Sequence, residues 1–411
     1  MIDHARSTAK QSSFSTVGLQ TVTDFILDGT HGSPEHTADG VPLLSAKNVH
    51  DGNLEFDVFD YVSEQEYDSF RHRLHIVPSD VVLTIVGSIG RTAVVETTRP
   101  FVLLRSVAVI RPKKEVMDPR YLRWVLESPR MQERLHLLTK QGSQPGVYLG
   151  EVRQLAVPLC DLGTQQRIVA KLDEQMAALD RAKKALAEQR EAATTLRSTV
   201  IRATLDPATH TTWPTYPLGD LLEKICNGVS ALQNQDKIGL PVTRIETIST
   251  GSIDTDRVGY LNLPADHLRD HLLEPGDILF SHINSFERIG NCAVYSGTPN
   301  RLVHGMNLLR FKPRRSLVAP EYLLCYLRAP TARAFFSATA RRAIGQASIN
   351  IRDLSVMPIA LPPLQIQKSI AEYLDNSSRQ TDALVAALGV RVRTLDSLRT
   401  SLLNAAFSGE V

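Results

Sequence analysis

The chain of 411 residues contains a long internal repeat without gaps. Residues 144–205 align with residues 346–407 at a constant offset of 202, and 13 of the 62 aligned pairs are identical. Shorter strings nearer the front of each copy also recur, with offsets that drift between 197 and 201. Pro78-Ser79-Asp80, for example, returns as Pro275-Gly276-Asp277. Because the chain is built twice, we expect two similar domains, each followed by the same kind of segment.

Apolar residues recur every seven positions in both aligned segments, which predicts two coiled-coil helices. Their equal lengths favour pairing with each other, and the alternative is that each is an amphipathic surface helix. The 38 residues from Ile168 to Leu205 would span ~57 Å at about 1.5 Å per residue. The residues expected to pack between the helices are Ile168, Leu172, Leu179, Leu186, Leu196 and Val200 in the first, and Ile370, Leu374, Leu384, Leu388, Leu395, Leu398 and Leu402 in the second.

The region before each helix mixes strand patterns with one short helix. The apolar runs 81–86 and 107–110 predict buried strands, and Asp118-Pro119 provides the N-cap and first position of a helix. The second copy repeats this order, so each front region is predicted to be a mixed α+β domain. We expect an N-terminal tail (1–17), domain 1 (18–157), helical spacer 1 (158–205), a Pro/Thr-rich linker (206–217), domain 2 (218–362), and helical spacer 2 with the C-terminal tail (363–411).

Composition and motifs argue against several functional classes. The net charge of +2 is small for a protein that holds DNA through phosphates alone. No long apolar run predicts a membrane span or a secretion signal, so we expect a soluble, cytoplasmic protein. The four cysteines are widely spaced, and we find no nucleotide-binding loop, nuclease triplet or metal-ligand cluster. The chain is therefore predicted to be non-catalytic and to hold no metal.

Two segments of each copy are candidates for contact with DNA. The loop before each long helix holds a glutamine at the same aligned position, preceded by cations, and glutamine can hydrogen bond to an adenine edge. The other candidate follows the buried strand, where small, polar and cationic residues gather. Docking of the loop onto its helix, or an ordinary exposed turn, would explain the same patterns. The candidate residues are Ser88, Arg91, Lys140, Gln141, Ser143 and Gln144 in copy 1, and His282, Asn284, Arg288, Arg341, Arg342 and Gln346 in copy 2.

Three strings of the second copy resemble one family, the DNA-specificity subunit of type I restriction-modification enzymes. They are Glu274-Pro275-Gly276-Asp277-Ile278-Leu279-Phe280-Ser281, then Gly345-Gln346-Ala347-Ser348-Ile349-Asn350, then Leu361-Pro362-Pro363-Leu364-Gln365-Ile366-Gln367. The likeness covers essentially the whole chain and occurs twice. The first copy departs at Val157-Pro158-Leu159, which lacks the double proline, and at residues 87–90, which lack the polar run.

The resemblance implies an α+β fold in which two similar target-recognition domains are joined by an antiparallel intramolecular coiled coil with pseudo-twofold symmetry. Each domain would read one half of a bipartite, asymmetric site in double-stranded DNA. Two methyltransferase subunits would supply S-adenosylmethionine chemistry, and two motor/nuclease subunits would supply ATP- and Mg-dependent cleavage. One alternative is a related system in which a single partner carries both activities. Another is a structural adaptor that holds two proteins and binds no DNA.

Overall fold

The computed structural model divides into two compact units, which we describe separately. Unit 1 comprises residues 1–186 and 390–411, and unit 2 comprises residues 187–389. Each unit therefore holds one domain together with parts of both long helices, α5 (Leu162–Leu205) and α10 (Leu364–Ser408). The structure describes residues 14–31, 34–50, 52–57, 60–140, 145–206, 210–234, 236–343 and 345–408.

Unit 1 is centred on a four-stranded antiparallel sheet. Its order is β2 (Thr23–Asp28), β10 (Val107–Pro112), β7 (Val81–Thr84) and β8 (Thr92–Val94). Alternate residues of β7 enter different cores: Val81 and Leu83 pack with helix α2 (Pro119–Glu127), whereas Val82 packs on the opposite face. This explains the continuous apolar run in the sequence, because both faces of the strand are covered. The side chain of Asp118 accepts hydrogen bonds at the start of α2, which confirms the predicted cap.

Shorter elements complete the domain of unit 1. Strand β1 (Ser15–Gly18) pairs with β11 (Ala156–Leu159) directly before α5, and thus joins the front of the domain to its end. The others are β3 (Val41–Leu44), β4 (Val49–His50), β5 (Asn53–Leu54), β6 (Tyr61–Val62), β9 (Val102–Leu103), α1 (Glu64–Arg73), α3 (Pro129–Leu138), α4 (Leu149–Arg153), η1 (Leu19–Val22) and η2 (Ala46–Asn48).

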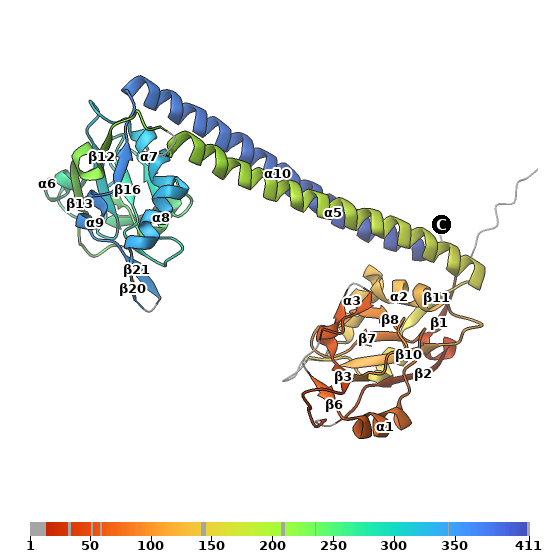
Figure 1. Ribbon diagram of the computed structural model, residues 1–411. Coiled ribbons are helices and arrows are strands. Elements are labelled where there is room, and N and C mark those ends of the chain that lie inside the picture. Colours follow the sequence, from red (N-terminus) through yellow and green to blue (C-terminus); the bar gives the residue numbers. More distant parts are fainter. Residues whose placement is uncertain are drawn as a thin grey trace, which may run out of the picture. The chain divides into compact units, whose positions relative to one another are not determined.

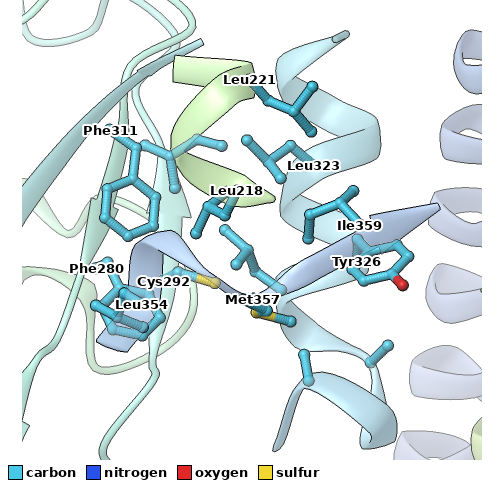
Figure 2. Close-up of a cluster of buried hydrophobic side chains, with 14 of the residues drawn as sticks. Leu218, Leu221, Phe280, Cys292, Phe311, Leu323, Tyr326, Leu354, Met357 and Ile359 are labelled. Carbon is cyan, nitrogen blue, oxygen red and sulfur yellow. The ribbon is translucent and has the colours of Figure 1, made fainter. Parts of the chain in front are cut away.

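Unit 2 repeats this topology. Its central sheet runs β13 (Leu222–Asn227), β19 (Leu309–Pro313), β16 (Ile278–Phe280) and β18 (Cys292–Val294), with helix α7 (Pro320–Arg328) in the place of α2. Figure 2 shows its core, where the rings of Phe280 and Phe311, from two neighbouring strands, stack on each other. The matching strand order confirms that the domain was duplicated together with the helix.

The remaining elements of unit 2 largely follow the same plan, and the antiparallel pair of β14 (Leu240–Val242) and β15 (Gly259–Leu261) corresponds to that of β3 and β6. Strand β12 (Thr215–Pro217) pairs with β22 (Pro358–Ala360), as β1 does with β11. The others are β17 (Ile283–Asn284), β20 (Arg341–Ala343), β21 (Gln346–Ser348), α6 (Ala265–Leu268), α8 (Pro330–Thr339), α9 (Ile351–Ser355), η3 (Leu218–Leu221), η4 (Ile245–Ile248), η5 (Thr255–Arg257) and η6 (Arg269–His271).

Each central sheet is pinned by the same buried ion pair. Asp80 lies 2.7 Å from Arg111 in unit 1, and Asp277 lies 2.6 Å from Arg310 in unit 2. Both aspartates also accept a backbone hydrogen bond from the residue three positions earlier. The repeated Pro-x-Asp string is therefore a turn whose carboxylate reaches the neighbouring strand. Loss of either partner would leave a buried charge uncompensated.

In each unit the two long helices lie side by side in opposite directions (Figure 1). In unit 1, Lys183 lies 2.6 Å from Asp396 and Met176 accepts a hydrogen bond from Arg399. In unit 2, Arg197 lies 2.7 Å from Asp382. As the residue numbers on α5 rise, the numbers of their partners on α10 fall, so the two helices are antiparallel. This confirms the intramolecular coiled coil and excludes two independent surface helices.

On each helix the predicted second packing position is wrong in part. Leu172, Leu179 and Leu388 are buried as expected, but Leu196, Leu384 and Leu398 are exposed by 64%, 50% and 45% of their surface. The second packing position is displaced by one residue: Ala371 is buried where Ile370 was predicted, and Ala406 is buried two residues before the end of α10. On α5 this position holds Met176, Lys183 and Arg197, which is why a search for apolar periodicity missed it. Ile168 and Leu374 are also buried, and Leu186, Val200, Ile370, Leu395 and Leu402 are half-buried.

Candidate DNA interface

In unit 2 the two candidate segments form one small sheet. Strand β17, which follows the central strand β16, pairs with β21, and β21 pairs with β20. Asn284 stands opposite Ala347, and Ala347 stands opposite Arg342. The predicted loop before α10 is thus a β-hairpin that extends from the body of the unit (Figure 1). Residues about 60 positions apart in the sequence are brought to the same surface.

The hairpin presents cationic and amide side chains to solvent. Arg341, Arg342 and Gln346 are all exposed, and the turn is completed by Gly345 with a φ of +73°. The Arg342 guanidinium stacks over the ring of Phe286, 3.7 Å from its centroid. Stacking of this kind restricts the arginine and leaves its N–H groups directed to the rim of the ring. None of the ion pairs among the described residues involves Arg288, Arg341 or Arg342, so this surface keeps its positive charge.

The turn that holds Arg288 is held in place by hydrogen bonds from helix α8. Arg333 of α8 donates hydrogen bonds to the carbonyl oxygens of Phe286, Glu287 and Ile289. At the end of the turn Gly290 has a φ of +85°, and a Cβ there would lie 2.4 Å from the Phe336 ring. Only glycine suits that position. Arg288 itself is exposed, so a rigid turn carries a free cationic side chain.

Two candidates in this segment have their side chains engaged or covered. The Asn284 amide donates to the Ser281 hydroxyl at 3.0 Å, and its carbonyl oxygen accepts from the Ser285 backbone N–H at 2.8 Å. His282 is only 9% exposed, so its prediction as a DNA-contacting residue is wrong. The chain lies beside the residue that follows β21 at this point, since Ile349 N–H donates to the His282 carbonyl oxygen. Burial lowers the pKa of His282, and the ring is neutral at pH 7.

Unit 1 brings together the corresponding segments. Val86 forms a bridge with Gly146, which also pairs with Lys140, and Gly87 N–H donates to the Pro145 carbonyl oxygen at 3.4 Å. Gly146, at one end of the loop, therefore pairs both with the segment that follows β7 and with Lys140 at the other end, in the order that β17, β21 and β20 have in unit 2. Three predicted contact residues, Gln141, Ser143 and Gln144, lie outside the described residues.

The described candidates of unit 1 are exposed, but they have partners within the protein. Arg91 lies 3.1 Å from the His50 ring nitrogen, and Lys140 lies 3.6 Å from Glu151 and over the Tyr148 ring. Ser88 is exposed, and its backbone carbonyl oxygen accepts from the Thr84 hydroxyl. Binding of a phosphate or base by Arg91 or Lys140 would compete with these contacts. The positive charge on the described part of this surface is weaker than in unit 2.

Sequence reasoning missed the residues that support the site. Phe286 and Arg333 are absent from the candidate set, because an aromatic ring beneath an arginine and a cation beneath a turn show no spacing pattern. A signal existed for the turn itself. Gly90 and Gly290 occupy equivalent positions with positive φ, and Gln132 donates to the Gly90 carbonyl oxygen much as Arg333 does to that of Ile289. The shared glycine, together with a polar side chain at the equivalent position of the following helix, would have identified the turn in both copies.

Two searches of the described residues bear on other classes of site. No group of three or more His, Cys, Asp or Glu side chains there has the arrangement of a metal site. None of the helices in that part of the chain is both long and apolar enough to cross a membrane.

Comparison with known proteins places the chain in a family. The family model of the type I restriction modification DNA specificity domain matches twice, at residues 63–189 and 210–389. One match falls on each copy of the repeat, and each ends within a long helix. The chain belongs to the family of type I restriction modification DNA specificity domains.

Relatives and solved structures agree with this assignment. A putative type I restriction enzyme MjaX specificity subunit of Methanocaldococcus jannaschii is 42% identical over 48% of this chain, and the match spans 45% of that relative, less than half its length. The EcoKI specificity subunit of Escherichia coli is 23% identical over 91% of this chain and 83% of its own. The homologues are thus specificity subunits, the recognition component of these systems, which supports the prediction of a non-catalytic chain.

The fold is shared with solved structures along nearly the whole length. The HsdS subunit from Thermoanaerobacter tengcongensis has a TM-score of 0.61 at 21% identity, covering 97% of both chains. A chain from a structure of a type I R-M system, described for complex assembly and conformational transition, has a TM-score of 0.75 at 21% identity, covering 97% of this chain and 98% of that one.

Proposed function

We propose that this chain is the DNA sequence-recognition subunit of a type I restriction-modification complex and that each domain reads one half of a bipartite, asymmetric site. One observation carries the proposal. In each unit the strand exit and the loop before the long helix meet at one surface, and in unit 2 that surface exposes Arg288, Arg341, Arg342 and Gln346. Arginine and glutamine are suited to guanine and adenine edges in the major groove, while neighbouring cations hold phosphates.

The small net charge supports a role within a complex. Three exposed arginines on one surface suffice to orient a duplex but neutralise few phosphates, so partner subunits would supply much of the affinity. Two methyltransferase subunits would dock on the helices and hold S-adenosylmethionine. Two motor/nuclease subunits would hold ATP and Mg. A system in which one partner chain carries both activities would differ in the proteins that co-purify with this chain.

A selection experiment tests the reading role of unit 2. The chain would be purified with its methyltransferase subunit, and bound sequences would be selected from random duplexes for the wild type and for Arg342→Ala with Gln346→Ala. We expect the wild type to select two half-sites and the variant to keep one while losing preference in the other, at about 1–3 kcal/mol per lost base contact. An equally exposed arginine, Arg314, provides the matched control.

The control separates readout from charge. Arg314→Ala removes one positive charge from the same unit and should leave both half-sites intact. If the double variant selects the same two half-sites as the wild type, the hairpin does not read bases. If the wild type selects no sequence at all, the structural adaptor is the better account.

A further inference from the structure

Each long helix carries one glutamine that is completely buried. Gln165 is the fourth residue of α5, and Gln367 is the fourth residue of α10. Both side chains are 0% exposed, and they are an identical pair in the repeat. A buried amide is stable only when its donors and acceptor all have partners, so the contacts of these residues define their role.

In unit 1 the Gln165 side chain joins three segments. Its Oε1 accepts a hydrogen bond from the Asp118 backbone N–H at 2.8 Å. Its Nε2 donates to the carbonyl oxygens of Val116 and Cys160, both at 2.8 Å. Val116 and Asp118 lead into α2, and Cys160 lies between β11 and α5. The long helix is therefore fastened to the start of the domain helix and to the end of the domain.

Gln367 makes the same three contacts in unit 2. Its Oε1 accepts from the Ala319 N–H at 2.8 Å, and its Nε2 donates to the carbonyl oxygens of Leu317 at 2.9 Å and Pro362 at 2.8 Å. All the partner atoms belong to the backbone. The surrounding side chains can therefore diverge between the copies while the junction keeps its geometry.

In each unit a buried tyrosine forms a further hydrogen bond between the domain helix and the strand that precedes the long helix. The Tyr121 hydroxyl donates to the Pro158 carbonyl oxygen at 3.1 Å, and the Tyr322 hydroxyl donates to that of Ala360 at 2.7 Å. Both tyrosines are fully buried, and burial raises the pKa of each hydroxyl. Helix α2 or α7 is thus held to both the strand and the long helix.

We propose that Gln165 and Gln367 are positioning residues that fix the angle of each recognition domain on its helix and thereby help to select the spacer between the half-sites. The inference rests on the proposed function. A domain that pivots on its helix would meet its half-site over a range of separations, because a small rotation at the junction displaces the distant hairpin. A rigid junction narrows that range, so it contributes to specificity more than to affinity.

The contacts between domain and long helix, which we call junction 1 in unit 1 and junction 2 in unit 2, differ beyond the shared glutamine and tyrosine. In unit 1, Asp173 accepts a hydrogen bond from the Trp124 indole at 2.8 Å and lies 2.7 Å from Arg120. In unit 2 the positions of Trp124 and Arg120 hold Cys325 and Glu321, and the aligned Asp375 pairs with Arg379 of its own helix at 2.5 Å. Glu321 cannot form an ion pair with Asp375. Junction 2 therefore depends more on its glutamine than junction 1 does.

The test measures discrimination among spacers. The complete chain with its methyltransferase subunit would be bound to duplexes that carry the selected half-sites separated by the preferred spacer or by one base pair more or less. In Gln367→Met a thioether of similar length leaves the two carbonyl oxygens and the N–H unsatisfied. We expect the preference for the correct spacer to fall by about fivefold, with affinity for an isolated half-site unchanged. Gln165→Met should lower it less.

A matched control separates positioning from stability. Leu302 is fully buried in a different cluster of unit 2, and Leu302→Ala should lower the melting temperature by a comparable amount. All variants would be assayed well below their melting temperatures. Equal loss of spacer discrimination in Leu302→Ala, or none in Gln367→Met, would overturn the inference.

Two further outcomes are informative. If Gln367→Met does not fold, Gln165→Met applies the same criterion at the reinforced junction. If the wild-type complex itself selects no bipartite site, the proposed function fails and this role fails with it. A wild type with a sharp spacer preference and an unaltered variant refutes the positioning role alone.

Discussion

His304 is a neutral histidine in the interior of unit 2. It is 1% exposed, and its Nε2 lies 2.8 Å from the Leu308 carbonyl oxygen, to which the neutral ring donates. Burial lowers its pKa from 6.5 to about 4. Protonation would place a charge in an apolar interior beside Arg310, so the folded state resists it.

This shift predicts a loss of stability in mild acid. Between pH 6.5 and 4 the unfolded chain binds the proton and the folded chain does not, so stability falls as the pH falls through that window. Above pH 6.5 the neutral His304 side chain makes its full contribution to the free energy of unfolding. That contribution is about 3 kcal/mol, and it is lost as the pH falls to 4. Chemical denaturation of the wild type and His304→Gln at several pH values measures it. The free-energy gap between the two proteins should change across the window, and a constant gap would show that His304 does not titrate there.

The sequence patterns correctly predicted which hairpin residues of unit 2 are exposed, but not the burial of His282 or the pairing of β17 with β21. Arg341, Arg342 and Gln346 were identified because the repeat aligns their loop with its counterpart, and all three are exposed. His282 was misplaced because exposure was assumed to begin where the apolar run ends, whereas the chain stays buried for two more residues after β16. The pairing of β17 with β21 joins segments distant in sequence, and no local pattern specifies it.

At the scale of elements, one of the two contact positions on each long helix mixes apolar side chains with long cationic ones. Heptad reasoning found the apolar position on each helix, represented by Leu179 and Leu388. It missed the other because Lys183, Arg197 and Arg399 occupy it. Lys183 and Arg197 pair with aspartates of α10, and Arg399 lies 3.4 Å from Glu127. Long cationic side chains can cover a seam with their methylene groups and still reach a carboxylate at its edge.

Two leucines four residues apart on α10 test this assignment. Leu388 is 2% exposed and Leu384 is 50% exposed. We expect Leu388→Ala to cost about 2–5 kcal/mol of unfolding free energy and Leu384→Ala to change it by less than about 0.5 kcal/mol. Denaturation followed by circular dichroism measures both variants under the same conditions. Equal losses would mean that the seam has been assigned to the wrong face.

At the scale of the whole chain, the internal repeat predicted most of the organisation. Its constant offset over residues 144–205 marks segments whose geometry is shared, namely the glutamine contacts between domain and helix, and the long helix itself. The drifting offsets before it mark loops that differ in length between shared elements: β3 pairs with β6 in unit 1 as β14 pairs with β15 in unit 2. The central sheets survive this divergence because their strand order depends on alternating burial rather than on particular side chains.

The central claim is that the paired helices set the distance between two half-sites, and lengthening them tests it most directly. One heptad inserted into each helix keeps the seam in phase and adds ~10 Å of rise, or ~3 base pairs of duplex. Mapping the sites methylated by the reconstituted complex should reveal both original half-sites with the spacer longer by about that amount. The same half-sites with an unchanged spacer would contradict the account.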